Sequence, residues 1–473
     1  MFTKDLIDNL LSTSIEENLH KKFEEIKKRD KEINSFITLG IEEAEKASKE
    51  IENKIKGNTQ GKLSGLVISI KDNIAVSNLR MTCGSKVLEN YVAPYDATVT
   101  NLIKKQDGII IGKCNMDEFA CGSDGTSSYF GPTKNPRNIE YVPGGSSSGS
   151  AASVAADFCD LSLGSDTGGS IRCPASFCGV YGFKPSYGLV SRYGLSDMAM
   201  SLEGPGPFAK DTYGIALLLD VIAGKDSRDT VTVEREKLSY TETVEKFNDS
   251  DIKKMKIAFA KEFFEGVDEG IKKIILDKIG DLESLGAKIE EVSMPNLKYA
   301  IPIYYLVVFS EFSSAMSKFD GFKYGHYVGG QDIVEAVSST REAAMGTEVK
   351  RRVLLGTFVT MEEFRGKWYT KALKARSVIK EDFKRIFNSY DLLIGPTMPT
   401  LPWKIGERIS DPLSMYSADI LTVSANLAGI CASSQPIGNL KQLPVGLQLH
   451  ADSLCESKLL KGMRAVEIAC GGM

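Results

Sequence analysis

The stretch that decides the fold of this 473-residue chain is the loop Gly164-Ser165-Asp166-Thr167-Gly168-Gly169-Ser170-Ile171-Arg172. It follows the short apolar run Leu161-Ser162-Leu163, which predicts a buried strand. Two glycines before a serine allow consecutive backbone N–H groups to face one point, as an oxyanion hole requires. The loop therefore suggests Ser170 as a nucleophile, although a plain Gly-Gly turn explains the segment at least as well when it is taken alone.

A second glycine-rich loop lies upstream and has the sequence Pro143-Gly144-Gly145-Ser146-Ser147-Ser148-Gly149-Ser150. Its glycines allow close backbone approach, and the alanine-rich helix that follows would direct N–H groups into it. A phosphate cradle is one alternative, but a P-loop ends in Gly-Lys-Ser/Thr, which this loop lacks. A flexible linker is another, but a linker would not lead directly into a helix and precede a second such loop. We therefore expect a catalytic loop.

Short apolar runs predict the architecture. They recur at 66–70, 109–111 and 161–163, each bounded by glycine or polar turn residues, and helical patterns at 98–105 and 151–156 lie between them. Alternating strands and helices predict an α/β fold with a large mixed, mostly parallel central sheet sandwiched by helices.

Lys71 is the candidate base for a serine nucleophile, because histidine is scarce. The three histidines are His20, His326 and His450, and none lies near either glycine-rich loop in the sequence. Lys71 ends the apolar run 66–70, where burial can keep a lysine neutral. Its pKa would have to fall from ~10.4 toward ~7–8. The alternative is an ordinary solvated lysine at a strand end.

Charge and composition argue against a nucleic-acid-binding, secreted, membrane-spanning or metal-binding protein. A net charge of −4 and a pI of about 5.8 argue against a large basic face, so we do not expect this chain to capture nucleic acid alone. No secretion signal is expected, and no run approaches the ~20 apolar residues that span a bilayer. Nine cysteines without a Cys-x-x-Cys pair predict reduced thiols in a cytoplasmic protein with no metal site.

Lys71 and the two glycine-rich loops together resemble the amidase signature family in order and spacing. The resemblance implies that Ser170 is the nucleophile, that Ser146 on a cis peptide is the bridging serine, and that neutral Lys71 is the ultimate base. It implies backbone oxyanion donors at Thr167, Gly168, Gly169 and Ser170. It also implies an amidase signature domain over 61–473, with a catalytic core at about 61–225, after an N-terminal helical segment over 1–60.

Two features flank these residues. Position 148 is serine, where the family usually has glycine. A positive φ at Ser148 would cost ~1 kcal/mol. Asp166 and Arg172 lie on either side of the nucleophile, and we expect them to brace the loop structurally.

Within the family, the chain most resembles the A subunits of glutamyl-tRNA(Gln) or aspartyl-tRNA(Asn) amidotransferases. Several of the resembling stretches lie outside the shared catalytic core, which separates this group from general amidases. The stretches are Asn115-Met116-Asp117-Glu118-Phe119-Ala120, Phe183-Lys184-Pro185-Ser186-Tyr187-Gly188, Val190-Ser191-Arg192-Tyr193-Gly194, Phe319-Asp320-Gly321, Glu348-Val349-Lys350-Arg351-Arg352 and Asp411-Pro412-Leu413-Ser414-Met415-Tyr416.

Glutamine is the substrate that this resemblance implies. A selective pocket should offer a guanidinium to its α-carboxylate and a carboxylate to its α-ammonium group. The resemblance points to Arg352 and Asp419, with Tyr304 or Tyr305 as a hydroxyl contact. From the residues alone, a solvated basic cluster, a surface acid and a half-buried tyrosine pair remain the alternatives.

The implied reaction hydrolyses glutamine to glutamate and ammonia. A partner B subunit would use the ammonia to amidate Glu-tRNA(Gln) or Asp-tRNA(Asn) with ATP and magnesium, and a small C subunit would clamp the two together. No cofactor is expected in this chain, and aminoacyl-tRNA would be met only through the complex. The rival hypotheses are a stand-alone amidase for another carboxamide, a non-catalytic scaffold subunit and a nucleotide-binding module.

Overall fold

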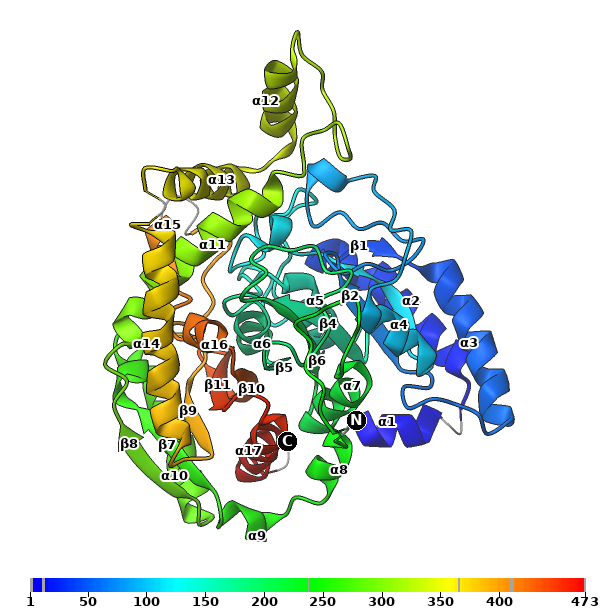
Figure 1. The fold of residues 1–473 in the computed structure, drawn as a ribbon. Coiled ribbons are helices and arrows are strands. Elements are labelled where there is room, and N and C mark those ends of the chain that lie inside the picture. Colours follow the sequence, from blue (N-terminus) through cyan, green and yellow to red (C-terminus); the bar gives the residue numbers. More distant parts are fainter. Residues whose placement is uncertain (1–2, 11–12, 237, 365, 408–411, 472–473) are drawn as a thin grey trace.

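A single eleven-stranded sheet runs through the described residues, which are 3–10, 13–236, 238–364, 366–407 and 412–471 (Figure 1). The structure is a computed structural model. The strands lie in the order β1-β3-β2-β4-β6-β5-β10-β11-β9-β7-β8. Their bounds are β1 (Phe36–Leu39), β2 (Val67–Lys71), β3 (Ile109–Cys114), β4 (Leu161–Asp166), β5 (Tyr181–Lys184), β6 (Gly204–Ala209), β7 (Lys256–Ala260), β8 (Lys288–Val292), β9 (Leu392–Pro396), β10 (Cys431–Leu440) and β11 (Leu443–Ala451).

The predicted mixed sheet is confirmed, but the prediction that it is mostly parallel is wrong. Among the described strands, six neighbouring pairs are antiparallel and four are parallel. The parallel pairs join β3, β2 and β4 at one end, and β9, β7 and β8 at the other. The centre is antiparallel because β5, β6, β10 and β11 occupy it, and the apolar runs at 66–70, 109–111 and 161–163 do not include these strands.

Both faces of the sheet are buried around β2 and β3, as the sandwich prediction requires. Successive residues of β2 and β3 alternate between two separate hydrophobic clusters. Val67, Ile109 and Ile111 belong to the cluster that contains residues of the helices α2 (Ile15–Ile33), α3 (Ile41–Lys56) and α5 (Ser148–Ala155). Ile68 and Ile110 belong to the cluster that contains residues of the helices α4 (Thr98–Lys105) and α7 (Thr212–Ile222). Helices therefore cover both faces around β2, and the end of that strand is buried from both sides.

The α-helices confirm most of the predicted helical segments. Segment 98–105 is α4, and the N-terminal helix that begins after Ser14 is capped by that serine, which accepts a hydrogen bond from the Glu17 N–H. The bounds are α1 (Thr3–Leu10), α2 (Ile15–Ile33), α3 (Ile41–Lys56), α4 (Thr98–Lys105), α5 (Ser148–Ala155), α6 (Arg172–Cys178), α7 (Thr212–Ile222), α8 (Tyr240–Glu245), α9 (Asp249–Ile252), α10 (Glu269–Ser284), α11 (Ala300–Met316), α12 (Ile333–Ala344), α13 (Thr347–Thr360), α14 (Tyr369–Phe387), α15 (Pro412–Ser417), α16 (Val423–Ala428) and α17 (Glu456–Ala469).

The N-terminal segment over 1–60 is not purely helical. Its strand β1 pairs antiparallel with β3, so this segment extends the sheet. The division of the chain at residue 60 stays a prediction. Asp411, part of one resembling stretch, lies outside the described residues.

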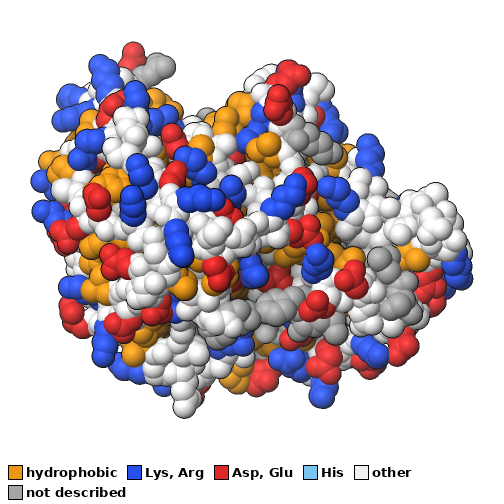
Figure 2. All heavy atoms as spheres, turned by 90° about the horizontal axis from the view of Figure 1, so that it is seen from below, with side chains coloured by type: hydrophobic (Ala, Val, Ile, Leu, Met, Phe, Trp, Pro, Cys, Tyr) orange, Lys and Arg blue, Asp and Glu red, His pale blue; other side chains and the backbone are white. Residues whose placement is uncertain are grey.

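The outer surface carries both signs of charge. On the face shown in Figure 2, lysine and arginine side chains are interspersed with aspartate and glutamate. The segment that contains α12 projects from the body of the protein (Figure 1). Within the part of the chain that the structure describes, no helix is both long and apolar enough to cross a membrane.

Candidate active site

Lys71 ends β2 with its side chain completely buried. Its Nζ lies 2.7 Å from Ser146 Oγ and 3.0 Å from Ser165 Oγ. Burial lowers the pKa of Lys71 to about 7, although the carboxylates of Asp117 and Asp166 oppose that shift. The predicted burial of Lys71 and its contact with Ser146 are confirmed. A lysine with this pKa can accept a proton near neutral pH.

The two glycine-rich loops lie against each other. The Ser147 N–H donates to the Ser170 carbonyl oxygen at 3.2 Å, and Ser147 Oγ donates to the Ser165 carbonyl oxygen at 3.0 Å. The Gly145–Ser146 peptide bond is cis, as the resemblance implied. Ser146 is 0% exposed and Ser170 is 8% exposed, so the predicted nucleophile lies closer to the surface than the predicted relay.

Ser148 does not have the positive φ that would have strained it. It begins α5, and its Oγ donates to Thr133 Oγ1 at 3.2 Å. The serine at this position is therefore accommodated within a helix, and the departure from the family pattern carries no backbone strain.

Asp166 and Arg172 form the expected brace. Both side chains are completely buried, and the Arg172 guanidinium donates to both Asp166 oxygens, at 3.1 and 3.0 Å. It also donates to Gln448 Oε1 and Asn426 Oδ1, at 2.8 and 2.6 Å. Burial by itself raises the pKa of Asp166. The Arg172 guanidinium lowers that pKa by more, and so holds it well below its usual range. The brace fixes the loop that carries Ser170 to β11 and α16.

The predicted oxyanion donors are not equivalent. The Gly169 N–H donates to Asp166 Oδ1 at 2.9 Å, so it belongs to the brace. Within the described residues, no acceptor bonds the N–H groups of Thr167, Gly168 or Ser170. These three remain available to a developing negative charge, and the role of all four stays a prediction.

Tertiary structure brings the predicted glutamine-binding residues together. Tyr305 on α11 donates to Asp419 Oδ2 at 2.9 Å, and Ser123 donates to the same oxygen at 2.9 Å. Burial raises the pKa of Asp419 to about 6, and the Ser123 and Tyr305 hydrogen bonds counteract this rise. Tyr304, the neighbour of Tyr305, packs on the nucleophile loop so closely that a Cβ added to Gly168 would lie 2.3 Å from its hydroxyl oxygen.

Arg352 completes this group from α13. It is 4% exposed, and its Nε donates to Glu348 Oε1 at 2.8 Å. Its guanidinium carbon lies 5.8 Å from the ring centres of both Tyr305 and Tyr416. The cation is therefore held between two aromatic rings and one carboxylate, at a place where a second carboxylate could bind.

The sequence profile of the amidase family matches residues 17–460. This chain belongs to the amidase family. The A subunit of the glutamyl-tRNA(Gln) amidotransferase from Carboxydothermus hydrogenoformans is 48% identical to this amidase over 448 residues, which cover 94% of this chain and 92% of that protein. The protein of the same name from Methanosphaera stadtmanae is 46% identical over 452 residues, or 95% and 96% of the two chains.

A solved structure supports the same relationship. The crystal structure of the glutamyl-tRNA(Gln) amidotransferase A subunit from Thermotoga maritima superposes on this amidase with a TM-score of 0.81 at 37% identity. The alignment covers 98% of this chain and 94% of that chain. The amidase signature fold is therefore confirmed.

A pocket of about 340 Å³ opens beside Arg352 in this amidase. Its lining includes Glu118, Asp124, Glu348 and Tyr416, for which no role was predicted. Burial and the neighbouring Asp117 raise the pKa of Asp124 to about 7. The only signal for these residues was their presence in or beside stretches that resemble the A subunits.

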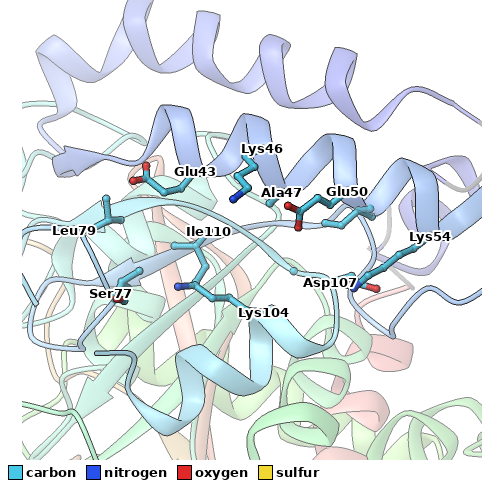
Figure 3. Close-up of a pocket in the computed structure, with 13 residues that line it drawn as sticks. Glu43, Lys46, Ala47, Glu50, Lys54, Ser77, Leu79, Lys104, Asp107 and Ile110 are labelled. Carbon is cyan, nitrogen blue, oxygen red and sulfur yellow. Dashed lines mark hydrogen bonds and ion pairs between the residues drawn. The ribbon is translucent and has the colours of Figure 1, made fainter. Parts of the chain in front are cut away.

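A second pocket, of about 320 Å³, lies between α3 and α4 and holds none of the predicted site residues (Figure 3). Lys54 forms an ion pair with Asp107, and Lys104 forms one with Asp96. Glu43 and Glu50 also line it. These mixed, largely paired charges give it no preference for an anion. Among the described residues, no group of three or more His, Cys, Asp or Glu side chains could hold a metal ion.

Proposed function

We propose that this amidase is the glutamine-hydrolysing A subunit of a tRNA-dependent amidotransferase. The observation that carries the proposal is the 2.7 Å contact between Lys71 Nζ and Ser146 Oγ in a fully buried site. Relatives that are 46–48% identical over nearly the whole chain have the name of that subunit, which favours this function over a stand-alone amidase.

In the proposed reaction, Ser170 Oγ attacks the side-chain amide carbon of glutamine. Its proton passes to Ser146 as the Ser146 proton passes to neutral Lys71. The C–N bond then breaks as the leaving nitrogen takes the proton from Lys71 back through Ser146. Ammonia departs, and a γ-glutamyl ester remains on Ser170. Water hydrolyses the ester with the same groups moving the protons, which releases glutamate. Free backbone N–H groups of the loop would stabilise the tetrahedral oxygen.

Arg352 would bind the α-carboxylate of glutamine, and Asp419 would bind its α-ammonium group. Tyr304 and Tyr305 would add hydroxyl contacts. The charges match the zwitterion, because a buried guanidinium and a buried carboxylate both lie next to Tyr305. A simple carboxamide has no α-carboxylate for Arg352 and no α-ammonium group for Asp419, which is the basis for selecting glutamine.

The ammonia would pass to a B subunit, which would amidate Glu-tRNA(Gln), the acceptor in the relatives' names, or Asp-tRNA(Asn). That protein would hold ATP and magnesium, and a small C subunit would join the two chains. We place the complex in the cytoplasm, in keeping with nine free cysteines.

The test is to purify the chain alone and with co-expressed B and C subunits, and to measure glutamate release from glutamine and ammonia release from glutamine and butyramide. We expect strong preference for glutamine, and formation of Gln-tRNA(Gln) only in the complex with ATP. Equal turnover of both amides without a co-purifying partner would indicate a stand-alone amidase. Unchanged amidation from glutamine after Ser170→Ala in this chain would indicate a scaffold.

A further inference from the structure

The helix that carries Arg352 has no N-terminal cap of its own. The N-cap residue of α13 is Gly346, which has no side chain to satisfy the first N–H groups of the helix. A distant residue instead bonds the N–H of the N-cap residue itself. The Gly346 N–H donates to Glu118 Oε2 at 2.8 Å, across 228 positions of sequence.

Hydrogen bonds also hold the backbone and the other carboxylate oxygen of Glu118. It begins the short 3₁₀ helix η2 (Glu118–Ala120), just after β3, and it is 4% exposed. Its other carboxylate oxygen accepts a hydrogen bond from Ser85 Oγ, and its own N–H donates to Ser127 Oγ at 3.2 Å. Glu118 therefore joins the start of α13 to Ser85, which follows β2, and to the segment that follows β3.

The contact between Glu118 and Gly346 is tight. A Cβ added to Gly346 would lie 2.2 Å from Glu118 Oε2, so the close approach requires glycine at this position. The φ of Gly346 is −72°, which any residue adopts, so the requirement comes from the carboxylate and not from the backbone. Burial raises the pKa of Glu118 to about 7, so above that pH its carboxylate is ionised and also interacts favourably with the positive end of the helix dipole.

Position along α13 connects this contact to the active site. Arg352 lies six residues beyond Gly346, or about 9 Å along the helix axis. Glu348, which accepts the Arg352 hydrogen bond, lies on the first turn. Glu118 and Arg352 line the same 340 Å³ pocket. If the first turn of α13 shifted along the helix axis or rotated about it, Arg352 would therefore move relative to Tyr305 and Asp419.

We propose that Glu118 is a positioning residue for substrate recognition. It anchors the N-terminus of α13 and thereby sets the place of Arg352 opposite Asp419. The inference rests on the proposed function, because it assumes that Arg352 binds the α-carboxylate of glutamine. Glu118 itself does not contact the substrate in this scheme.

The experiment compares Glu118→Ala and the near-isosteric Glu118→Gln in the full chain, purified with its partner subunits. The substrates are glutamine and 4-aminobutanamide, which is glutamine without its α-carboxylate. We expect Glu118→Ala to raise the KM for glutamine at least tenfold while kcat changes less than threefold, with a smaller rise for Glu118→Gln. The kcat/KM for 4-aminobutanamide should change less than threefold. An equal loss with both substrates, or a fall in kcat alone, would overturn the proposal.

A matched control and a double variant sharpen the result. Glu362→Ala removes an exposed carboxylate just beyond the other end of α13 and should change neither parameter. Gly346→Ala should raise the glutamine KM on its own, because its methyl group collides with Glu118. In the Glu118→Ala background, where the carboxylate is gone, it should add nothing. Additive effects would contradict the proposed contact.

Hydrogen exchange separates failure of this inference from failure of the proposed function. Glu118→Ala should speed amide exchange in residues 346–352 and leave α14 unchanged, whether or not the wild-type chain hydrolyses glutamine. Unchanged exchange in 346–352 would overturn the anchoring role. Faster exchange in an enzyme that does not hydrolyse glutamine would refute only the proposed function.

Discussion

Lys71 Nζ lies 2.7 Å from Ser146 Oγ, and both side chains are completely buried. Ser170, on the neighbouring loop, reaches the surface with 8% of its area. In the proposed mechanism, Ser170 is the outer nucleophile, Lys71 is the inner base, and Ser146 relays the proton between them. Because the base is out of water, it can be neutral at a pH where an ordinary lysine is charged.

Activity should depend on deprotonation of Lys71. Its pKa is lowered to about 7 by burial, and only the neutral form accepts a proton. The rate of glutamine hydrolysis should therefore rise with pH through about 7, and Lys71→Ala should lose about 10²–10⁴-fold in kcat. Steady-state rates between pH 5.5 and 9 provide the measurement. A flat profile in the wild-type enzyme would contradict a titrating base.

The burial of Lys71 that supports activity should lower the stability of the fold. The folded-state pKa of about 7 lies below the ordinary 10.5, so between these values the unfolded chain binds a proton that the folded chain lacks. The free energy of unfolding contributed by Lys71 therefore rises with pH across this window. Lys71→Met should be more stable than the wild type at pH 7, by roughly 1–4 kcal/mol, with a difference that shrinks toward pH 10. Urea unfolding at several pH values tests this.

The acyl-enzyme should form on Ser170. Ser170→Ala should abolish the covalent adduct with a reactive glutamine analogue, whereas Ser146→Ala should slow its formation and leave a trace. Peptide mass mapping locates the adduct. Cys173 is the nearest thiol in sequence, but burial raises its pKa well above the usual value, which makes it a poor nucleophile. An adduct on Cys173 or Ser146 would overturn the mechanism and leave the fold untouched.

Arg352 should select glutamine, and Arg351 is its matched control. The Arg351 side chain is 37% exposed and pairs with the same Glu348. Arg352→Ala should reduce kcat/KM for glutamine by about 2 kcal/mol or more, which is about 30-fold. Arg351→Ala should have a much smaller effect. A larger loss with Arg351→Ala would transfer the assignment to that residue, and thermal melting of each variant checks that it folds.

The Asp166–Arg172 brace should be costly to break. Removing one partner of a buried ion pair leaves the other charge uncompensated, so Asp166→Ala should lower the free energy of unfolding by about 3–5 kcal/mol. Because the pKa of Asp166 is held well below its usual range, the ionised brace stabilises fully above about pH 4 and weakens as the pH falls. Glu242→Gln, which breaks an exposed pair with Lys246, should leave the urea midpoint unchanged.

The sequence by itself determined the elements whose signals are local. Segment 98–105 is helical because its own residues favour a helix, and Lys71 ends a buried strand because the run before it is apolar. The order of Lys71, Ser146 and Ser170 identified the family and the fold. Apolar runs did not reveal β5 or β6, because glycine and proline interrupt the apolar residues of these segments. They did not reveal the antiparallel centre either, because a short apolar run contains no information on strand direction.

Tertiary structure alone decided which distant groups meet. Tyr305 contacts Asp419 across 114 positions, and Glu118 anchors Gly346 across 228. It also decided that the Arg172 guanidinium meets Gln448 and Asn426, which are 276 and 254 positions away. These outcomes could not be derived from neighbouring residues, because a buried polar group bonds with whichever partner packing brings within about 3 Å, and packing depends on the whole sheet.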